Sequence, residues 1–536
     1  MQYKTMGVML DMSRNAVMKV SQLKKYVDYL AAMGFNAVEL YTEDTFKIED
    51  EPYFGYLRGG YTAAEIKEVD AYAASKGIEL IPCIQTLAHF TNTKKLPYYW
   101  DLFDCDDILC IGEPKVYEFL DKIFKTLSEN FTSRKVNIGM DEAHNVGLGK
   151  YLEKNGYRDR SEILVEHLNK VVEIAEKYGF KCHMWSDMFF RLISGGAYDP
   201  ELLKNVHVSP EVAAKVPESV ALTYWDYYST EKKKYDLMFE KHLEFGRDVW
   251  FAGGAWAWQG FSPLGEFSIR SMRPAMESVR EKGIENVIFT VWGDNGKDCS
   301  YFALLPTLYV IRQFADGNFD MEKIKADMKE KFGWDYDEWL DLDLPNDLRV
   351  NGVKDDKWNC VCKTMAFTDP FLGMRDVDYA NIDRIPYGEY GKKIASHAQN
   401  AGEFSYIFDT LAKLCAYMEY KADLGIRTRK AYQEKNTDEL KRLVEDYASA
   451  VACLDVFAEA QKKLWMRENK AFGWEVQEIR LGGVRARLLT CGERLQAYLN
   501  GDLDCIEELE EKVLPNLDRN GFMYHLYRET VAPSDI

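Results

Sequence analysis

The chain lacks an excess of positive charge. It carries 68 Lys and Arg residues against 87 Asp and Glu residues, which gives a formal net charge of −19 at pH 7. An acidic surface repels phosphate backbones and anionic lipid headgroups. We therefore expect neither nucleic acid nor a membrane among the partners of this protein.

Long apolar runs are also missing. No stretch approaches the roughly 18 uninterrupted apolar residues that a membrane span needs. The first residues reach charges at Lys4 and Asp11, which leaves no apolar segment of the length found in secretory signals. The eleven cysteines are odd in number and form no CxxC pairs at zinc-finger spacing, so we predict reduced thiols. These features predict a cytoplasmic protein without structural disulfides.

The composition is not that of a disordered chain. Hydrophobic residues make up 47% of the 536 residues and aromatic residues 14%, enough to bury a sizeable core. A chain of this length exceeds what one hydrophobic core usually organises. We expect one large domain and one smaller domain.

Eight short β-rich segments recur between amphipathic helical stretches over the first three hundred residues. The helical stretches end near glycine, as a helix C-terminus often does, at Gly34, Gly77 and Gly179. Eight strands alternating with helices predict an α/β fold, a (β/α)₈ TIM-like barrel. The expected strands are 7–10, 36–41, 79–84, 135–140, 181–185, 220–225, 248–254 and 286–292.

Helical periodicity replaces the strand pattern after about residue 305, apart from a polar, irregular stretch near 345–395. Asn436 and Glu439 have the spacing of a capping box, and apolar residues at helical spacing follow them. We therefore predict a barrel over residues 1–310 and a mostly α-helical C-terminal domain over 311–536 that packs against it.

Aromatic and acidic side chains follow most of the expected strands. The strand ends of a (β/α)₈ barrel form one face, where active sites lie. Flat aromatic rings suit the C–H faces of pyranose sugars, and carboxylates accept hydrogen bonds from their hydroxyls, so the pattern predicts a site for a small oligosaccharide or glycan. The residues are His89, Asp141, Glu142, Trp185, Asp187, Tyr224, Trp225, Asp226, Tyr227, Trp256, Trp258, Trp292 and Asp294.

Asp141 and Glu142 are the most informative pair. Adjacent carboxylates repel each other, so one tends to keep its proton near neutral pH and can act as a general acid. A retaining glycosidase with a protein nucleophile needs two carboxylates about 5–5.5 Å apart across the sugar, a geometry for which sequence neighbours are poorly placed. Substrate-assisted hydrolysis avoids this difficulty, because the 2-acetamido oxygen of the sugar is itself the nucleophile.

The run VNIGMDEA at 136–143 resembles the signature of glycoside hydrolase family 20. The runs GVMLDMSR at 7–14 and GGYTAAEIKEVDAYAASKGIELIPCIQTLAHF at 59–90 resemble its first strand and its third βα unit. This resemblance covers about residues 5–300. It implies an exo-β-N-acetylhexosaminidase that removes terminal β-linked GlcNAc, with GalNAc as an alternative, with retention and through an oxazolinium intermediate.

The resemblance also implies roles for individual residues. Glu142 would be the acid/base and Asp141 the residue that orients the acetamido group. His89 would be a pocket histidine, and Trp292 with Asp294 would form the Trp-x-acidic pair of the eighth strand.

The sequence departs from the family pattern at the first strand. Many members have an Arg before the first-strand Gly that binds the sugar 3- and 4-hydroxyls, but Met6 stands here. Either Arg14 or another residue then takes that role, or the contacts to the sugar hydroxyls differ from those of the family. Because the first strand begins at residue 7, we expect the barrel without the small β domain that usually precedes it. Tyr224 and Tyr227 both remain candidates for holding the acetamido oxygen.

Two other functions stay open, a retaining glycosidase with a protein nucleophile that acts on sugars without a 2-acetamido group, and a non-catalytic carbohydrate-binding barrel. The letters DEAH at 141–144 also spell a helicase box, but the partner phosphate-binding motif is absent. Eight scattered His residues form no HExxH motif, so we expect neither a metal nor another cofactor.

Overall fold

The computed structural model describes residues 2–357, 359–515 and 526–534. Eight parallel strands close into a barrel in sequence order, and β8 pairs back onto β1 with Phe289 opposite Val8. The predicted (β/α)₈ barrel is therefore confirmed. The strands are β1 (Thr5–Asp11), β2 (Ala37–Tyr41), β3 (Glu79–Cys83), β4 (Lys135–Asn137), β5 (Lys181–Trp185), β6 (Ala221–Trp225), β7 (Val249–Gly254) and β8 (Asn286–Val291).

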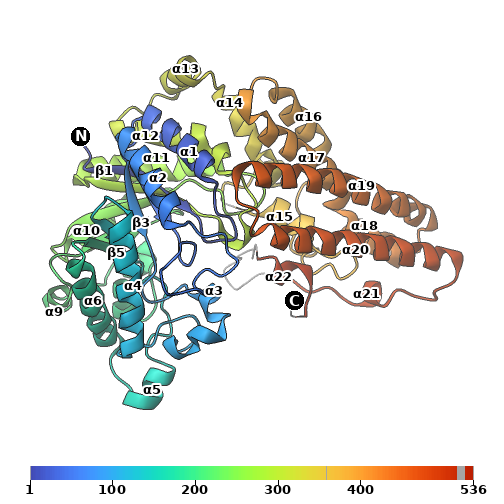
Figure 1. Cartoon of the computed structure of the whole chain (residues 1–536). Helices are drawn as coiled ribbons and strands as arrows, with labels where there is room; N and C mark the ends of the chain where they lie inside the picture. The colour runs from blue at the N-terminus through green and yellow to red at the C-terminus, as the bar shows by residue number, and fades with distance from the viewer. Residues whose placement is uncertain (1, 358, 516–525, 535–536) are drawn as a thin grey trace.

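Helices surround the barrel in Figure 1 and return the chain from each strand to the next. The long ones are α1 (Val20–Met33), α2 (Ala63–Ser75), α4 (Pro114–Asn130), α6 (Arg160–Lys177), α10 (Lys232–Leu243), α11 (Gly265–Lys282) and α12 (Leu305–Asp316). Short ones lie in the loops: α3 (Thr91–Lys94), η1 (Pro97–Leu102), α5 (Lys150–Asn155), α7 (Asp187–Ser194), α8 (Pro200–Leu203), α9 (Pro210–Lys215), η2 (Asp294–Gly296) and η3 (Tyr301–Leu304).

Successive side chains along each strand point alternately into two different hydrophobic layers. Strand residues such as Val8 and Phe289 belong to one large cluster with the buried faces of the surrounding helices. Their neighbours, such as Met9 and Ile288, belong to a second cluster inside the barrel. Successive side chains of a strand point to opposite faces, so counting in steps of two from an inward residue reaches the side chains that line the barrel mouth.

The chain after the barrel is helical, as predicted. Its helices are α13 (Met321–Phe332), α14 (Tyr336–Leu340), η4 (Asp341–Asn346), α15 (Val361–Phe367), α16 (Tyr387–His397), η5 (Gly402–Phe404), α17 (Ser405–Lys421), α18 (Leu424–Gln433), α19 (Thr437–Glu468), α20 (Trp474–Asn500), α21 (Glu507–Glu510) and α22 (Arg528–Val531). The stretch near 345–395 holds a small antiparallel pair, β9 (Arg349–Val350) and β10 (Val353–Lys354), between turns and short helices. The domain boundary at residue 310 stays a prediction.

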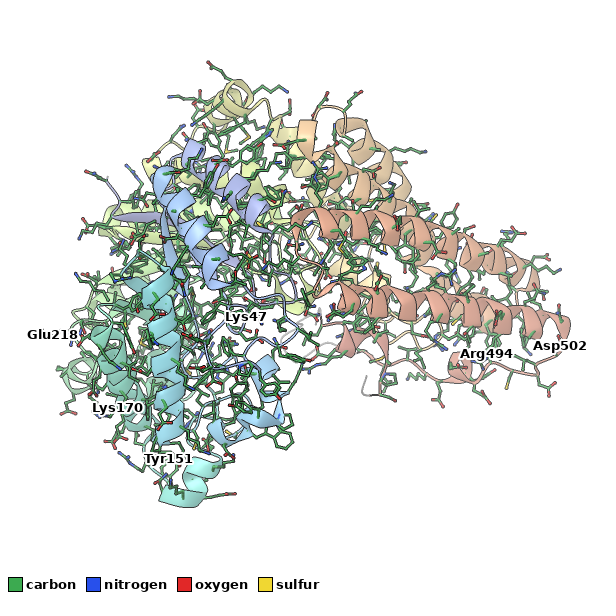
Figure 2. All side chains as sticks on the ribbon, viewed as in Figure 1. Lys47, Tyr151, Lys170, Glu218, Arg494 and Asp502 are labelled. Carbon is green, nitrogen blue, oxygen red and sulfur yellow. The ribbon has the colours of Figure 1, made fainter. Side chains whose placement is uncertain are left out.

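The longest helices, α19 and α20, extend away from the barrel (Figure 1). The Asn436 side chain caps α19 by accepting a hydrogen bond from the backbone N–H of Glu439. Figure 2 labels Arg494 and Asp502 at the end of this helical pair farthest from the barrel. The turn between α19 and α20 is therefore the end that meets the barrel.

All eleven cysteines carry free thiols. Within the described residues, none of the helices is both long and apolar enough to cross a membrane.

Candidate active site

Three titratable side chains from the ends of β3 and β4 lie together at the barrel mouth. His89 Nε2 is 3.0 Å from Asp141 Oδ2 and 3.8 Å from Glu142 Oε2. Asp141 is the more enclosed carboxylate, with 14% of its side chain exposed against 44% for Glu142. The pair predicted from sequence is thus one inner and one outer carboxylate beside a histidine.

The backbone at these positions is strained. His89, Met140 and Glu142 have φ angles of 61°, 70° and 52°, in the left-handed region that side chains other than glycine rarely adopt. Such strain concentrates at functional sites, where surrounding contacts hold it in place. It also ends β4 at Asn137, three residues before the end we predicted.

Gln85 holds this turn in place. Its Oε1 accepts a hydrogen bond from the N–H of Met140 at 3.3 Å, and its Nε2 donates to Asp141 Oδ1 at 2.9 Å. Gly139 is required here, because a Cβ at that position would lie 2.1 Å from Gln85 Oε1. A single amide therefore fixes both the backbone turn and the Asp141 carboxylate.

His89 and Asp141 each stabilise the charged form of the other. Burial disfavours a charge on either group, but the negative charge of Asp141, whose Oδ2 lies 3.0 Å from His89 Nε2, raises the pKa of His89 to about 10. Against its own burial, the positive charge of His89 and the hydrogen bond from Gln85 lower the pKa of Asp141. At neutral pH the two form an imidazolium and a carboxylate.

The side chain of Asp187, at the start of α7, forms hydrogen bonds with the loop after β4, with α7 and with β6. Its Oδ2 accepts hydrogen bonds from the N–H of Glu142 at 3.2 Å and from Arg191 Nε at 3.0 Å, and its Oδ1 accepts one from Trp225 Nε1 at 3.4 Å. Burial and the negative charge of Asp141 raise the pKa of Asp187 to about 7. The two neighbouring aspartates therefore have pKa values shifted in opposite directions, because their partners differ.

Aromatic rings form the floor and one side of the mouth. Trp292 meets Tyr41 edge-on at 4.8 Å between ring centroids and Trp185 at 6.1 Å. Tyr227 stacks on Trp225 at 5.4 Å. Burial raises the pKa of the Tyr227 hydroxyl, although hydrogen bonds with Trp292 and Thr290 oppose this.

Arg14 packs against two of these rings. Its guanidinium lies 4.9 Å from the ring centroids of both Tyr41 and Trp292. It forms ion pairs with Asp11 at 3.1 Å, and with Glu43 and Asp294 at 3.7 Å each. The structure thus brings Arg14, Trp292 and Asp294 together.

Tyr224 and Asp226 do not reach the mouth, which corrects their prediction as substrate-binding residues. The Tyr224 ring packs against Phe239 and His242 of α10, and its hydroxyl donates to Asp226 Oδ2 at 2.8 Å. Asp226 also accepts the backbone N–H of Tyr228 at 2.8 Å. The reason is strand alternation, which turns the even-numbered positions of β6 toward the helices.

The structure also corrects the prediction that Trp256 binds the substrate directly. It is fully buried, stacks on Trp258 at 4.2 Å, and donates its indole N–H to the carbonyl oxygen of Tyr227 at 3.0 Å. It supports the Tyr227 wall from behind.

Sequence reasoning missed several residues of the mouth: Asp11, Tyr41, Glu43, Gln85 and Tyr228, while Asp187 was named only as a strand-end carboxylate. Asp11, Tyr41 and Gln85 continue the inward alternation of Met9, Glu39 and Cys83, so counting in twos could have found them. Tyr228 is half-exposed. Its place in an irregular loop leaves no such periodic signal.

Comparison with known proteins agrees with this geometry. Residues 3–236 match the catalytic domain of glycosyl hydrolase family 20, and residues 337–526 match the C-terminal domain described as Glycoside Hydrolase 20C. The chain belongs to glycoside hydrolase family 20.

Individual relatives in this family are distant. The chain is 28% identical to a beta-hexosaminidase of Akkermansia muciniphila over 173 residues, 26% of this chain and 34% of that protein. It is 26% identical to human hexosaminidase D over 229 residues, 40% of this chain and 43% of that protein. A family 20 exo-beta-N-acetylglucosaminidase structure from Vibrio harveyi with N-acetylglucosamine superposes at a TM-score of 0.47 and 19% identity, over 63% of this chain and 58% of that one. The chain therefore spans only about a third to two fifths of the length of these two curated relatives.

The site also offers potential metal ligands. His89, Asp141 and Glu142 place one ligand atom each within 4.8 Å of one another. An imidazole binds a metal only in its neutral form, so a cation here would have to displace the proton that His89 holds beside Asp141.

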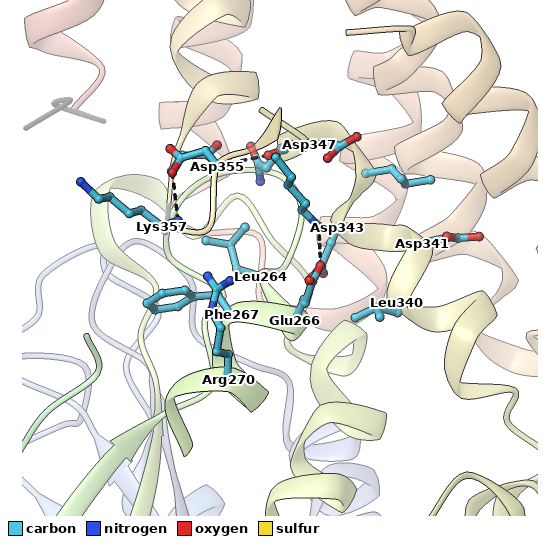
Figure 3. A pocket seen from close by; sticks show the side chains of 14 residues that line it. Leu264, Glu266, Phe267, Arg270, Leu340, Asp341, Asp343, Asp347, Asp355 and Lys357 are labelled. Carbon is cyan, nitrogen blue, oxygen red and sulfur yellow. Dashed lines mark hydrogen bonds and ion pairs between the residues drawn. The ribbon is translucent and has the colours of Figure 1, made fainter. Parts of the chain in front are cut away.

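A separate hollow of about 170 Å³ lies where α11 meets η4 and the β9–β10 hairpin (Figure 3). Asp343 caps α11 there by accepting the N–H groups of Gly265 and Glu266 at 2.9 and 2.8 Å. Burial raises the pKa of Asp343 to about 7. None of the residues predicted for the sugar site lines this hollow.

The unusual protonation of Asp187 predicts a pH-dependent stability. Its pKa is raised from 3.8 to about 7, so its contribution to stability is present below pH 4 and is lost as the pH rises toward 7 and above. The difference in unfolding free energy between wild type and Asp187→Asn should fall over that range by at most about 1.4 kcal/mol per pH unit. Urea unfolding of both proteins at pH 4 to 8 measures it, and a difference that stays constant with pH would contradict the assignment.

Proposed function

We propose that this chain is an exo-β-N-acetylhexosaminidase that removes terminal β-linked GlcNAc, with GalNAc as a second terminal sugar, by a retaining, substrate-assisted mechanism. The observation that carries the proposal is the division of the Asp141–Glu142 pair into an enclosed, ionised carboxylate and an open one. The aromatic floor beside them suits a sugar ring. Membership of family 20 agrees with this activity.

In the proposed first step, the acetamido oxygen of the sugar attacks its own anomeric carbon. The bond from that carbon to the leaving oxygen breaks, and Glu142 donates the proton that the leaving oxygen takes up. Asp141 accepts a hydrogen bond from the acetamido N–H and faces the positive charge of the oxazolinium ring. Water then opens the ring and returns a proton to Glu142.

The remaining residues position the sugar. The Tyr227 hydroxyl lies within the aromatic cluster and is the better placed of the two tyrosines to meet the acetamido oxygen, since Tyr224 faces α10. Buried Trp185 Nε1 has no hydrogen-bond partner among the described residues and is a donor available near the floor. Arg14 and Asp294 would bind hydroxyls on the far side, in place of the family arginine that Met6 replaces.

The requirement for a 2-acetamido group tests the reaction class. We expect 4-nitrophenyl N-acetyl-β-glucosaminide to be hydrolysed, and the corresponding β-glucoside and β-galactoside to be cleaved far more slowly, because they lack the internal nucleophile. Equal cleavage of both kinds of sugar would indicate a protein nucleophile instead. Binding without turnover of any of them would indicate a non-catalytic sugar-binding barrel.

Glu142→Gln should remove the proton donor while keeping the size of the side chain. General acids contribute about 10²–10⁴-fold, so kcat/KM for glycosides with poor leaving groups should fall by that order, and activated aryl glycosides should lose less. A series of substituted phenyl glycosides measures this. A loss that did not depend on leaving-group pKa would rule out the acid role of Glu142.

An N-acetylglucosamine thiazoline, which mimics the cyclised intermediate, should bind at least about 10²-fold more tightly than N-acetylglucosamine. Asp141→Asn should weaken the thiazoline more than the simple sugar, because the carboxylate charge acts on the cationic ring. Inhibition titrations on wild type and variant compare the two ligands. Equal losses would mean that Asp141 only shapes the pocket, and failure of the thiazoline to bind the wild type would overturn the mechanism.

A further inference from the structure

The turn between α19 and α20 reaches the barrel mouth on the side of Arg14 and Asp294. We propose that this turn and the first residues of α20 position the Arg14–Asp294 wall of the sugar site, so that the C-terminal helices determine how tightly the sugar is held. The proposal rests on the proposed function for its catalytic readout. The contacts that carry it fall on the loops after β8, β1 and β2.

The loop after β8 is held most firmly. Arg480 of α20 donates to the carbonyl oxygen of Asn295 at 2.7 Å and to its side-chain Oδ1 at 3.0 Å. Gln477, one turn earlier, donates to the carbonyl oxygen of Gly296 at 2.8 Å. Asn295 has a φ of 52°, so these bonds hold a strained backbone directly beside Asp294.

Buried charges reinforce the same loop. Lys363 of α15 donates to the carbonyl oxygen of Asn295 at 2.9 Å and lies 2.5 Å from Asp298. Glu468, the last residue of α19, accepts a hydrogen bond from Ser300 Oγ at 2.5 Å. Losing one partner of such a buried group is costly, which makes the loop conformation depend on the helices.

The loop after β1, which carries Arg14, meets the same turn. The N–H of Lys19 donates to the carbonyl oxygen of Glu468 at 3.0 Å, and the N–H of Lys470 donates to the carbonyl oxygen of Val17 at 2.8 Å. Gly473 has a φ of 90°, and a Cβ there would lie 2.2 Å from the carbonyl oxygen of Asn15. Only glycine permits this approach to the residue that follows Arg14.

The loop after β2 completes the contact. Lys470 Nζ lies 2.8 Å from Glu65 and 4.9 Å from the ring centroid of Tyr61. Between described residues, the hydrogen bonds that join α19 and α20 to the barrel end on these three loops and on the start of α2. They include none to the loops that carry His89, Asp141 and Glu142, so the helices can affect sugar binding separately from proton transfer.

Arg480→Ala tests the proposal, with Arg485→Ala as the matched control. Arg485 lies on the same helix but, among the described residues, forms its ion pair with Asp455 of α19, at 2.7 Å. With 4-nitrophenyl N-acetyl-β-glucosaminide, Arg480→Ala should raise KM on the order of 10-fold and change kcat and the leaving-group dependence little, because a displaced binding group weakens sugar binding without removing the acid. Arg480→Lys should recover part of the loss, and Arg485→Ala should match wild type.

Hydrogen–deuterium exchange separates failure of this inference from failure of the proposed function. Exchange in residues 12–18 and 293–300 should rise in Arg480→Ala and stay unchanged in 84–90 and 139–146, whether or not the wild type hydrolyses the glycoside. Equal exchange and equal KM in the two arginine variants would overturn the positioning role. A rise spread over all four segments would also overturn it, since it would mean general destabilisation.

Discussion

The Asp141 carboxylate has to stay ionised inside a barrel mouth where burial alone would favour its neutral form. The protonated imidazole of His89 at 3.0 Å and the amide of Gln85 at 2.9 Å make this possible. Much of the site follows from that constraint. The left-handed turn at Met140 and Glu142 places Asp141 between these donors, and the negative charge of Asp141 in turn helps to keep a proton on Asp187 nearby. An ionised carboxylate in an enclosed site is suited to stabilise a cation that develops next to it.

Asp11 joins the ends of two strands on the other side of the mouth. Its Oδ2 accepts hydrogen bonds from the N–H of Gly293 at 2.9 Å and from Arg14 at 3.1 Å, so one buried carboxylate joins the ends of β1 and β8. The C-terminal helices hold the loops beyond these two strands. The mouth is thus built from a half that carries Asp141 and Glu142 and a half that carries Arg14 and Asp294.

Local patterns in the sequence predicted most of the fold. Seven of the eight strands begin and end within two residues of the expected positions, because short β-rich runs, helical periodicity and glycine at helix ends are all local signals. Alternation within a strand also explains which of the predicted residues reach the barrel mouth. Trp292 and Asp294 are two apart and both reach the mouth, whereas Tyr224 and Asp226 are two apart on the opposite parity and face α10.

The remaining features depend on contacts between distant segments. Arg480 and Asn295 are 185 residues apart, and no local pattern links them. The charge states of Asp141 and Asp187 depend on burial and on partners from three strands, which composition and spacing do not reveal.

The protonation of His89 tests the account most directly. In ¹⁵N spectra of the histidine side chains, the His89 signal can be assigned by its loss in His89→Gln. We predict that this imidazole stays doubly protonated through neutral pH and titrates near pH 10, which requires an ionised Asp141 beside it. An imidazole that loses its proton at pH 6 to 7 would contradict the account, because Asp141 would then lack the cation that keeps it charged.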